Sequence, residues 1–407
     1  MNIIYKFKTR VSQYGLKYVM KIIMRNKVYR HIDNFVFATA KKILKNAKLK
    51  NSIVIESHND FDCNGGAFYE YLIKNGYNKK YKIVWLVKNK SPKNLPENVY
   101  AYDFFKPSIR KSYYQCTAKI MTCDDYILKK GNVNQKIYYL GHGAVSLKKP
   151  KGYINLSKDI DYCLTPSEFM VKIKADTLQM DSENTKQIIL GCPVHDILYL
   201  PSDNEIKKIT DKSYAKIILW MPTFRKHVSF GRNDSRIDLP FGIPLVYNDE
   251  EMQILEDILV KSNILLIIKI HPMQDLTTVK IKQTEYIKIL DGASVKELGI
   301  DNYRLMKDVN ALISDYSSVA YDYLHLNRPI AYTVDDMGEY NMDFIVDDPK
   351  ELMRGAIIKD MADMVTFINQ IAEEEDCYSD LRKDILDKLF TYQDGNSIQR
   401  LINHMQL

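Results

Sequence analysis

Residues 310–322 change abruptly from apolar to polar character. An apolar run over 311–313 predicts a short strand, and the polar residues 314–318 follow it directly, before a helical pattern starts. Hydroxyl groups and free backbone N–H groups at a helix start favour a bound phosphate, because the helix dipole attracts negative charge. The alternative is that Ser317 or Ser318 merely caps the helix. The chemistry at other strand ends bears on this choice.

A histidine between two glycines follows another apolar run, at residues 137–140. Gly141 and Gly143 allow the backbone to turn sharply and leave the imidazole of His142 uncovered. Histidine titrates near neutral pH and is the commonest general base, whereas a buried structural histidine seldom needs a glycine on each side. We therefore expect a catalytic role for His142.

A second histidine stands at a strand end in the C-terminal half. His271 follows the apolar run 265–270, and the proline after it stops the strand. Lys269 belongs to the same run. We expect this strand end to contact the substrate, although a histidine tucked under a loop is the simpler alternative.

The residues after the apolar run 217–220 offer a hydroxyl and a guanidinium. Pro222, Thr223 and Arg225 lie in this stretch. A hydroxyl and an arginine at a strand end can hold phosphate oxygens, whereas the alternative is an arginine on a surface loop. The stretch is thus a second candidate for phosphate binding.

Strand and helix patterns alternate from residue 51 onward, which predicts parallel sheets with helices on both faces. In the first half the expected strands cover residues 52–56, 81–87, 98–102, 119–122, 136–140, 161–164 and 187–190. In the second half they cover residues 215–220, 264–270, 286–290, 311–313 and 329–333. Ligands bind beyond the carboxyl ends of such strands, so the polar residues described above are expected to line binding sites.

A polar stretch with a proline, residues 200–204, separates the two halves. A chain of 407 residues suits two domains of similar size. We predict a basic amphipathic helical segment at 1–48, an N-terminal Rossmann-like domain at 49–202 and a C-terminal Rossmann-like domain at 203–407. The long polar insertion 225–245 is expected to border the cleft between them.

Positive charge is concentrated in the first fifty residues. They hold 13 Lys and Arg residues against one acid, whereas the rest of the chain holds 45 basic and 50 acidic residues. Apolar and aromatic residues recur there at helical spacing, but no apolar run approaches the roughly 20 residues that span a bilayer. The pattern predicts a helix that lies on an anionic membrane surface. Nucleic acid is disfavoured, because no reader motif is present and the rest of the chain would repel phosphates.

The sequence indicates neither a metal centre nor a disulfide framework. Its six cysteines show no Cys-x-x-Cys spacing, which fits a reduced cytoplasmic setting, and no His, Asp and Glu residues cluster with metal-ligand spacing. The glycine motifs of dinucleotide-binding and Walker loops are also missing. No cofactor is firmly implied, although isolated aspartates could help hold Mg²⁺ on a substrate phosphate.

Five motifs in a fixed order resemble the CDP-glycerol glycerophosphotransferase family of teichoic acid synthesis. They are Gly-His-Gly (141–143), Gly-x-Pro (191–193), Pro-Thr-Phe-Arg (222–225), His-Pro (271–272) and Ser-Asp-Tyr-Ser-Ser (314–318), with Asp322 four residues further on. The resemblance covers roughly residues 50–400. It implies a GT-B-like fold, with two doubly wound Rossmann-type domains that face a cleft and an active site between them.

The resemblance also implies an activity: transfer of glycerol phosphate from CDP-glycerol to an acceptor hydroxyl on a lipid-linked saccharide, teichoic acid or capsular polymer, with release of CMP. His142 matches the family's general base, and His271 matches its second essential histidine. The donor-binding positions of the family correspond to Pro222, Thr223, Ser317, Ser318 and Asp322, to which we add Gly141, Gly143, Arg225 and Lys269 as substrate-binding candidates. A peripheral location on the cytoplasmic face of the membrane is implied as well.

Two departures from the family pattern leave the polyol of the donor open. The family's His-Gly-Thr-Pro is His-Gly-Ala-Val at residues 142–145, and its Gly-x-Pro-Arg is Gly-Cys-Pro-Val at residues 191–194. CDP-ribitol is therefore an alternative donor. A GT-B glycosyltransferase that uses a nucleotide sugar, held by Asp322 or Asp336, is another alternative. The third is a non-catalytic protein that binds nucleotides at the membrane surface.

Overall fold

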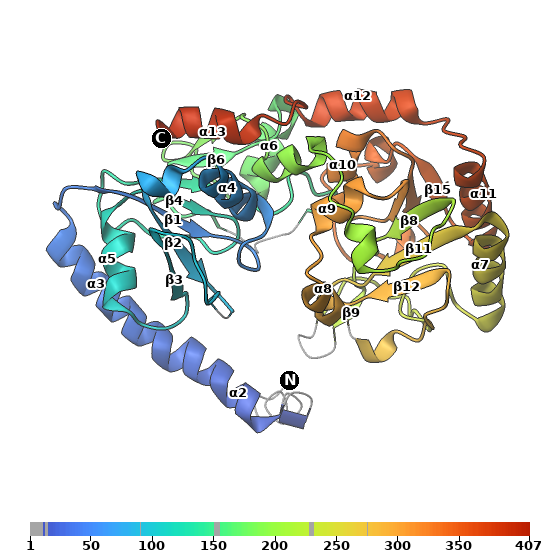
Figure 1. The fold of residues 1–407 in the computed structure, drawn as a ribbon, viewed down its shortest axis with the longest axis horizontal. Coiled ribbons are helices and arrows are strands. Elements are labelled where there is room, and N and C mark those ends of the chain that lie inside the picture. The colour runs from blue at the N-terminus through green and yellow to red at the C-terminus, as the bar shows by residue number, and fades with distance from the viewer. Residues whose placement is uncertain (1–10, 13–14, 90, 150–154, 228–231, 275) are drawn as a thin grey trace. The chain divides into compact units, whose positions relative to one another are not determined.

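The computed structural model describes residues 11–12, 15–89, 91–149, 155–227, 232–274 and 276–407. These residues form two compact α/β units, each built around one parallel sheet (Figure 1). Unit 1 comprises residues 1–142, 152–196 and 396–407, and unit 2 comprises residues 143–151 and 197–395. The two parallel sheets confirm the predicted α/β class.

The sheet of unit 1 has seven strands in the order β3-β2-β1-β4-β5-β6-β7, and neighbouring strands pair in parallel. Ile53, Val54 and Ile55 of the inner strand β1 (Lys50–Glu56) are fully buried. Successive side chains of a strand point to opposite faces, so both faces of this sheet are covered. The strands are β1 (Lys50–Glu56), β2 (Lys82–Val87), β3 (Val99–Asp103), β4 (Ala118–Cys123), β5 (Lys136–Tyr139), β6 (Tyr162–Leu164) and β7 (Lys186–Ile188). The helices after β1 are α4 (Cys63–Lys74), α5 (Ile109–Thr117), α6 (Glu168–Thr177) and α13 (Ser397–Met405).

The sheet of unit 2 has six parallel strands in the order β12-β11-β8-β13-β14-β15. Leu265, Leu266 and Ile267 in β11 are fully buried, so this sheet too is covered on both faces. The strands are β8 (Lys216–Trp220), β11 (Ile264–Lys269), β12 (Ile287–Leu290), β13 (Ala311–Ser314), β14 (Ile330–Thr333) and β15 (Ala356–Ile358). The helices are α7 (Asp249–Ser262), α8 (Gly292–Leu298), α9 (Asn302–Lys307), α10 (Val319–Tyr323), α11 (Met361–Ala372) and α12 (Ser379–Leu389).

Shorter elements connect these strands and helices. Short 3₁₀ helices cover Tyr77–Lys79, Pro193–Tyr199, Glu205–Lys208, Leu276–Thr278, Leu324–Leu326, Met337–Glu339 and Pro349–Leu352. Within the polar insertion 225–245, β9 (Lys226–His227) and β10 (Arg232–Asn233) form a two-residue antiparallel pair. Residues 228–231 of the insertion lie outside the described residues.

The last helix, α13, packs with unit 1, whereas the predicted domains assigned the whole segment 203–407 to the second half. The physical reason is a set of polar contacts with residues far away in sequence. The carboxylate of Asp196 accepts hydrogen bonds from the N–H groups of Ser397 (2.9 Å) and Ile398 (2.8 Å) at the start of α13. Arg400 donates to the carbonyl of Leu190 at 2.8 Å. The chain also changes unit between residues 142 and 143, which no sequence feature predicted.

A long helical segment precedes β1. It consists of α2 (Leu16–Ile23), a π-helical stretch (Met24–Tyr29) and α3 (Arg30–Leu44), and Figure 1 shows α3 beside α5. A partly buried ion pair attaches it, because Nζ of the buried Lys111 in α5 lies 2.9 Å from a carboxylate oxygen of Asp33. Residues 1–10 and 13–14 of the predicted N-terminal segment lie outside the described residues.

This helix leaves large apolar side chains exposed, with Phe35 and Ile43 at 72% and 74% of their full accessibility. No helix in the described part of the chain is both long and apolar enough to cross a bilayer.

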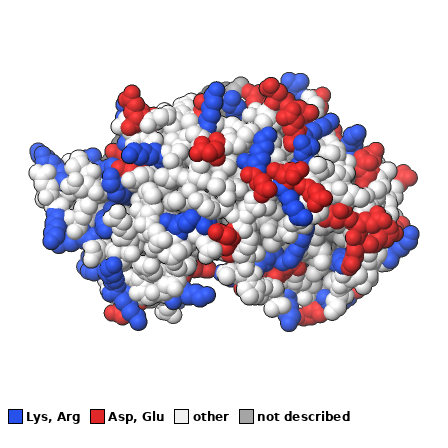
Figure 2. Space-filling view, turned by 90° about the horizontal axis from the view of Figure 1, so that it is seen from above, with Lys and Arg blue, Asp and Glu red and all other residues white. Residues whose placement is uncertain are grey.

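On the face of the molecule seen in Figure 2, acidic side chains gather mainly over unit 2.

Candidate active site

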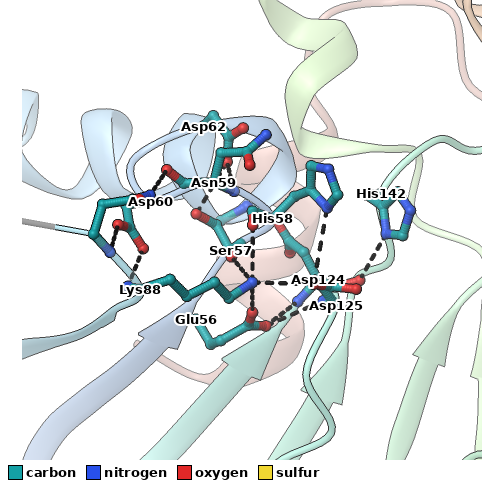
Figure 3. A network of polar contacts seen from close by, with 12 residues as sticks. Glu56, Ser57, His58, Asn59, Asp60, Asp62, Lys88, Asp124, Asp125 and His142 are labelled. Carbon is teal, nitrogen blue, oxygen red and sulfur yellow. Dashed lines mark hydrogen bonds and ion pairs between the residues drawn. The ribbon is translucent and has the colours of Figure 1, made fainter. Parts of the chain in front are cut away.

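A buried carboxylate organises the strand ends of unit 1 (Figure 3). Glu56, the last residue of β1, accepts hydrogen bonds from the N–H groups of Asp124 (3.0 Å) and Asp125 (3.1 Å), which follow β4. Its other oxygen lies 2.5 Å from Nζ of Lys88, which follows β2. Burial raises the pKa of the Glu56 carboxyl, and the contacts with Lys88 and the two N–H groups oppose that rise. One side chain therefore connects the ends of three neighbouring strands.

His142 lies on a turn directly after β5 and is exposed to solvent. Gly141 and Gly143 adopt φ angles of 73° and 80°, so both glycines supply the left-handed backbone that the sequence predicted. Nδ1 of His142 lies 3.4 Å from the carbonyl oxygen of Asp124. A carbonyl only accepts hydrogen bonds, so Nδ1 carries the proton in the neutral ring and Nε2 keeps its lone pair. This tautomer is the one that a general base acting through Nε2 requires.

Asn64 in α4 supports this turn and was not predicted as a site residue. Its amide nitrogen donates to the carbonyls of Leu140 (3.2 Å) and Gly141 (2.8 Å), and its oxygen accepts from the N–H of Val194 at 3.0 Å. Asn64 is buried, so each of these hydrogen bonds is shielded from water. The side chain therefore fixes the backbone on which His142 stands.

A second imidazole, that of His58, stacks on His142 with ring centroids 4.5 Å apart and an interplanar angle of 20°. Nδ1 of His58 lies 3.9 Å from a carboxylate oxygen of Asp125. Burial lowers the pKa of His58, and the neighbouring imidazole of His142 lowers it further. Neither His58 nor Asp125 belongs to a recognisable motif, so their position after a predicted strand was the one signal that could have pointed to them.

In unit 2 the predicted substrate-binding arginine is buried in an internal network. Arg225 donates from Nε and Nη2 to the two oxygens of Asp336 at 2.6 and 3.0 Å, and from Nη1 to Asp315 at 2.7 Å. Its side chain is only 2% exposed. The hydroxyl of Thr223 donates to Asp315 at 2.9 Å and accepts from Arg225 at 2.6 Å. Arg225 and Thr223 thus connect the ends of β8, β13 and β14, and their donors serve protein carboxylates instead of facing a ligand.

The strand end after β11 differs, because its basic residue makes no internal pair. Lys269 is 7% exposed, and in the described part of the chain its ammonium takes part in no hydrogen bond or ion pair. Burial lowers the pKa of this ammonium. His271 is half-buried, and its Nδ1 accepts the N–H of Met273 at 3.0 Å. In the neutral ring Nε2 of His271 therefore carries the hydrogen.

The polar turn after β13 places two hydroxyls at the start of α10. Ser318 occupies the N-cap position without a side-chain capping hydrogen bond, and Ser317 accepts only a 3.5 Å contact from the N–H of Val319. The capping alternative is therefore weakly supported. Gly143 approaches this turn, since a Cβ atom added there would lie 2.9 Å from Oγ of Ser318.

Two further predicted residues of unit 2 are buried. Asp322 is 2% exposed and accepts a hydrogen bond from the hydroxyl of Tyr303 at 3.0 Å. Pro222 is buried beside Thr223 in the turn after β8. Helix α10 has only five residues before a 3₁₀ turn, so the turn offers hydroxyl groups without a long helix dipole behind them.

Comparison with known proteins identifies the family. A family model described as CDP-glycerol:poly(glycerophosphate) glycerophosphotransferase matches residues 37–407. The chain is 25% identical over 371 residues to a teichoic acid glycerol-phosphate primase of Bacillus subtilis (strain 168), covering 85% of this chain and 90% of that protein. It is 24% identical over 416 residues to a teichoic acid glycerol-phosphate transferase of Staphylococcus aureus (strain NCTC 8325 / PS 47), covering 93% and 98%.

Among solved structures, the wall teichoic acid polymerase TagF superposes with a TM-score of 0.70 at 18% identity, over 100% of this chain and 98% of that one. The fold is therefore GT-B-like, with two α/β units. The chain belongs to the CDP-glycerol:poly(glycerophosphate) glycerophosphotransferase family. The family predicted from the five motifs is therefore confirmed.

The Arg225 network yields a prediction about stability. Asp336→Ala leaves a buried guanidinium without its two-point partner, so the free energy of unfolding should fall by about 3–5 kcal/mol. Tyr316→Phe removes only the hydroxyl that donates to Asp336 at 3.1 Å and should cost about 1 kcal/mol. Urea unfolding in a Trp85→Phe background measures both, because Trp220 in β8 then reports on unit 2 alone. Equal losses in the two variants would contradict this ranking.

Proposed function

We propose that the protein transfers glycerol phosphate from CDP-glycerol to an acceptor hydroxyl and releases CMP, with His142 as the general base. The observation that carries this proposal is the orientation of His142. Its Nδ1 faces the carbonyl of Asp124, which leaves the lone pair of Nε2 for an acceptor hydroxyl. Family membership supports the donor and the reaction class.

In this mechanism, Nε2 of His142 takes the proton of the acceptor hydroxyl. The acceptor oxygen attacks the β-phosphorus of CDP-glycerol in line, the bond from that phosphorus to the bridging oxygen breaks, and CMP leaves with the electron pair. Such a transfer depends on positioning and on charge stabilisation and needs no covalent intermediate.

The groups proposed to hold the donor pyrophosphate lie in unit 2. The ammonium of Lys269 has no internal partner among the described residues, and it lies with Nε2–H of His271 at the end of β11. The hydroxyls of Ser317 and Ser318 follow β13, and β8 lies between β11 and β13 in the sheet. These groups can stabilise the negative charge that develops on the leaving CMP. Thr223 and Arg225 are better described as positioning residues, since their donors hold Asp315 and Asp336.

The alternatives differ in their donor. Glycerol is favoured over ribitol because the family description and the relatives named above refer to glycerol phosphate. A nucleotide-sugar transferase would use Asp322 or Asp336 on the sugar, but both carboxylates are buried and accept hydrogen bonds from protein groups. The acceptor remains a lipid-linked saccharide, a teichoic acid or a capsular polymer.

The base assignment is tested by substitution. His142→Ala should lower CMP release from CDP-glycerol by about 10²–10⁴-fold, because the acceptor hydroxyl loses its proton acceptor. Donor affinity should change little, and calorimetric titration with CDP-glycerol measures it separately. His31→Ala, which removes an exposed histidine of α3, is the matched control. Near wild-type turnover of His142→Ala would refute the assignment, and a parallel assay with CDP-ribitol and nucleotide sugars would identify the donor.

Lys269 allows function and stability to be separated. Lys269→Met removes a buried charge that has no internal partner in the described chain, so the melting temperature should stay the same or rise. CDP-glycerol binding should weaken about tenfold to a hundredfold, because a charge-assisted hydrogen bond to phosphate is lost. Lys261→Met, an exposed position on α7, serves as the control in the same titration. Unchanged donor affinity in Lys269→Met would remove Lys269 from the site.

We also propose that the helical segment before β1 lies on anionic membranes. Its exposed apolar side chains, together with the lysines and arginines of the same segment, support this location. The double variant Phe35→Gln/Ile43→Gln should reduce co-sedimentation with anionic vesicles at least about tenfold, since each side chain contributes on the order of 1.5–3 kcal/mol when fully buried. Lys41→Gln/Lys42→Gln should instead reduce the salt dependence of binding. If vesicle binding of the apolar variant equals that of the wild type, this segment is not the anchor.

A further inference from the structure

Three side chains of metal-ligating type meet in unit 1, although they are far apart in sequence. One ligand atom from each of His58, Asp125 and His142 lies within 4.8 Å of the other two. The two imidazole rings stand side by side over the turn that contains Asp124 and Asp125 (Figure 3). The sequence predicted no metal-ligand cluster because spacing along the chain does not show that parallel strand ends bring these residues together.

One ring nitrogen of His58 makes no hydrogen bond to the described part of the chain. Its Nδ1 is buried, and within the described residues it makes no hydrogen bond, although a carboxylate oxygen of Asp125 lies 3.9 Å away. An unpaired buried nitrogen is costly unless a ligand satisfies it.

The surrounding residues orient these ligands. The carbonyl of Asp124 accepts from Nδ1 of His142, which directs Nε2 outward. The carboxylate of Asp125 also accepts from Lys88 at 3.1 Å, and its backbone N–H is held by Glu56. Partners of this kind fix the tautomer and the direction of metal ligands. Two carboxylates, those of Glu56 and Asp125, surround one ammonium, so the local charge also suits a cation.

We propose that His58, Asp125 and His142 form a binding site for one divalent transition-metal ion of the zinc class. Two imidazoles and one carboxylate suit zinc, cobalt or nickel, whereas Mg²⁺ prefers a shell of oxygen ligands. Three protein ligands leave a coordination position open for water or a substrate oxygen.

The site has a regulatory consequence, which rests on the proposed role of His142 as the base. A metal ion that binds Nε2 of His142 takes up the lone pair that would accept the proton. Metal binding and base catalysis through Nε2 therefore exclude each other. Zinc should inhibit CMP release, and a chelator should restore it.

Direct binding of Co²⁺ and Zn²⁺ to the full-length, metal-free protein tests the site without an activity assay. We expect one ion per chain by calorimetric titration, visible Co²⁺ bands without the charge-transfer absorption of a thiolate ligand, and no competition by Mg²⁺. His58→Gln and Asp125→Asn should each weaken binding at least about tenfold. His31→Gln, Glu70→Gln and Cys63→Ser are controls for adventitious imidazole, carboxylate and thiol binding, and their affinity should not change.

Circular dichroism and thermal melting show whether each variant is folded. Wild-type affinity in folded His58→Gln and Asp125→Asn, or no binding by the wild type, would overturn the metal site. Failure of the metal site can be distinguished from failure of the proposed function. If metal binds as expected but His142→Ala retains full turnover, the site stands and the base assignment fails. If metal does not bind but His142→Ala loses activity, the base assignment stands.

Discussion

The buried carboxylate of Glu56 is the interaction on which the arrangement of unit 1 depends. It ends β1, accepts two backbone N–H groups after β4 and pairs with Lys88 after β2. A buried ion pair contributes little net stability over an apolar pair, but removing one partner is strongly destabilising. Its role here is therefore geometric. It fixes the turn that carries Asp124. The carbonyl of Asp124 in turn sets the tautomer of His142. A buried charge thus determines which nitrogen of an exposed imidazole can act as a base.

In unit 2, too, a buried charged side chain connects strand ends, but its charge is positive. Arg225 connects the strand ends of β8, β13 and β14 through Asp315 and Asp336, and it is almost completely buried. In both units an ion-pair network lies behind the turns, and the turns themselves carry the groups that can take part in chemistry. Lys269 is the exception, since it is a buried charge without an internal partner in the described chain. An unpaired buried charge is costly, which makes an anionic ligand its natural partner.

Much of the fold could be predicted from the sequence, because apolar runs that end in polar turns are strong local signals. The strand before His142 and its two glycines are of this kind. His58 and Asp125 could not be found, since single residues become a cluster only when parallel strands align their ends. Arg225 was correctly placed at a strand end, but sequence does not show whether a guanidinium will meet a ligand or a buried carboxylate. The place of helix α13 in unit 1 was not predicted for a similar reason, because its partners lie about two hundred positions earlier.

The central claim is that the imidazole of His142 accepts the proton of the acceptor hydroxyl. Chemical rescue tests it most directly. CMP release by His142→Ala is measured with CDP-glycerol and acceptor at increasing concentrations of free imidazole, with the folded state and donor affinity verified beforehand. The account predicts a low rate that rises with imidazole, because the added base occupies the space left by the side chain. A rate that is already close to wild type, or one that does not respond to imidazole, would contradict it.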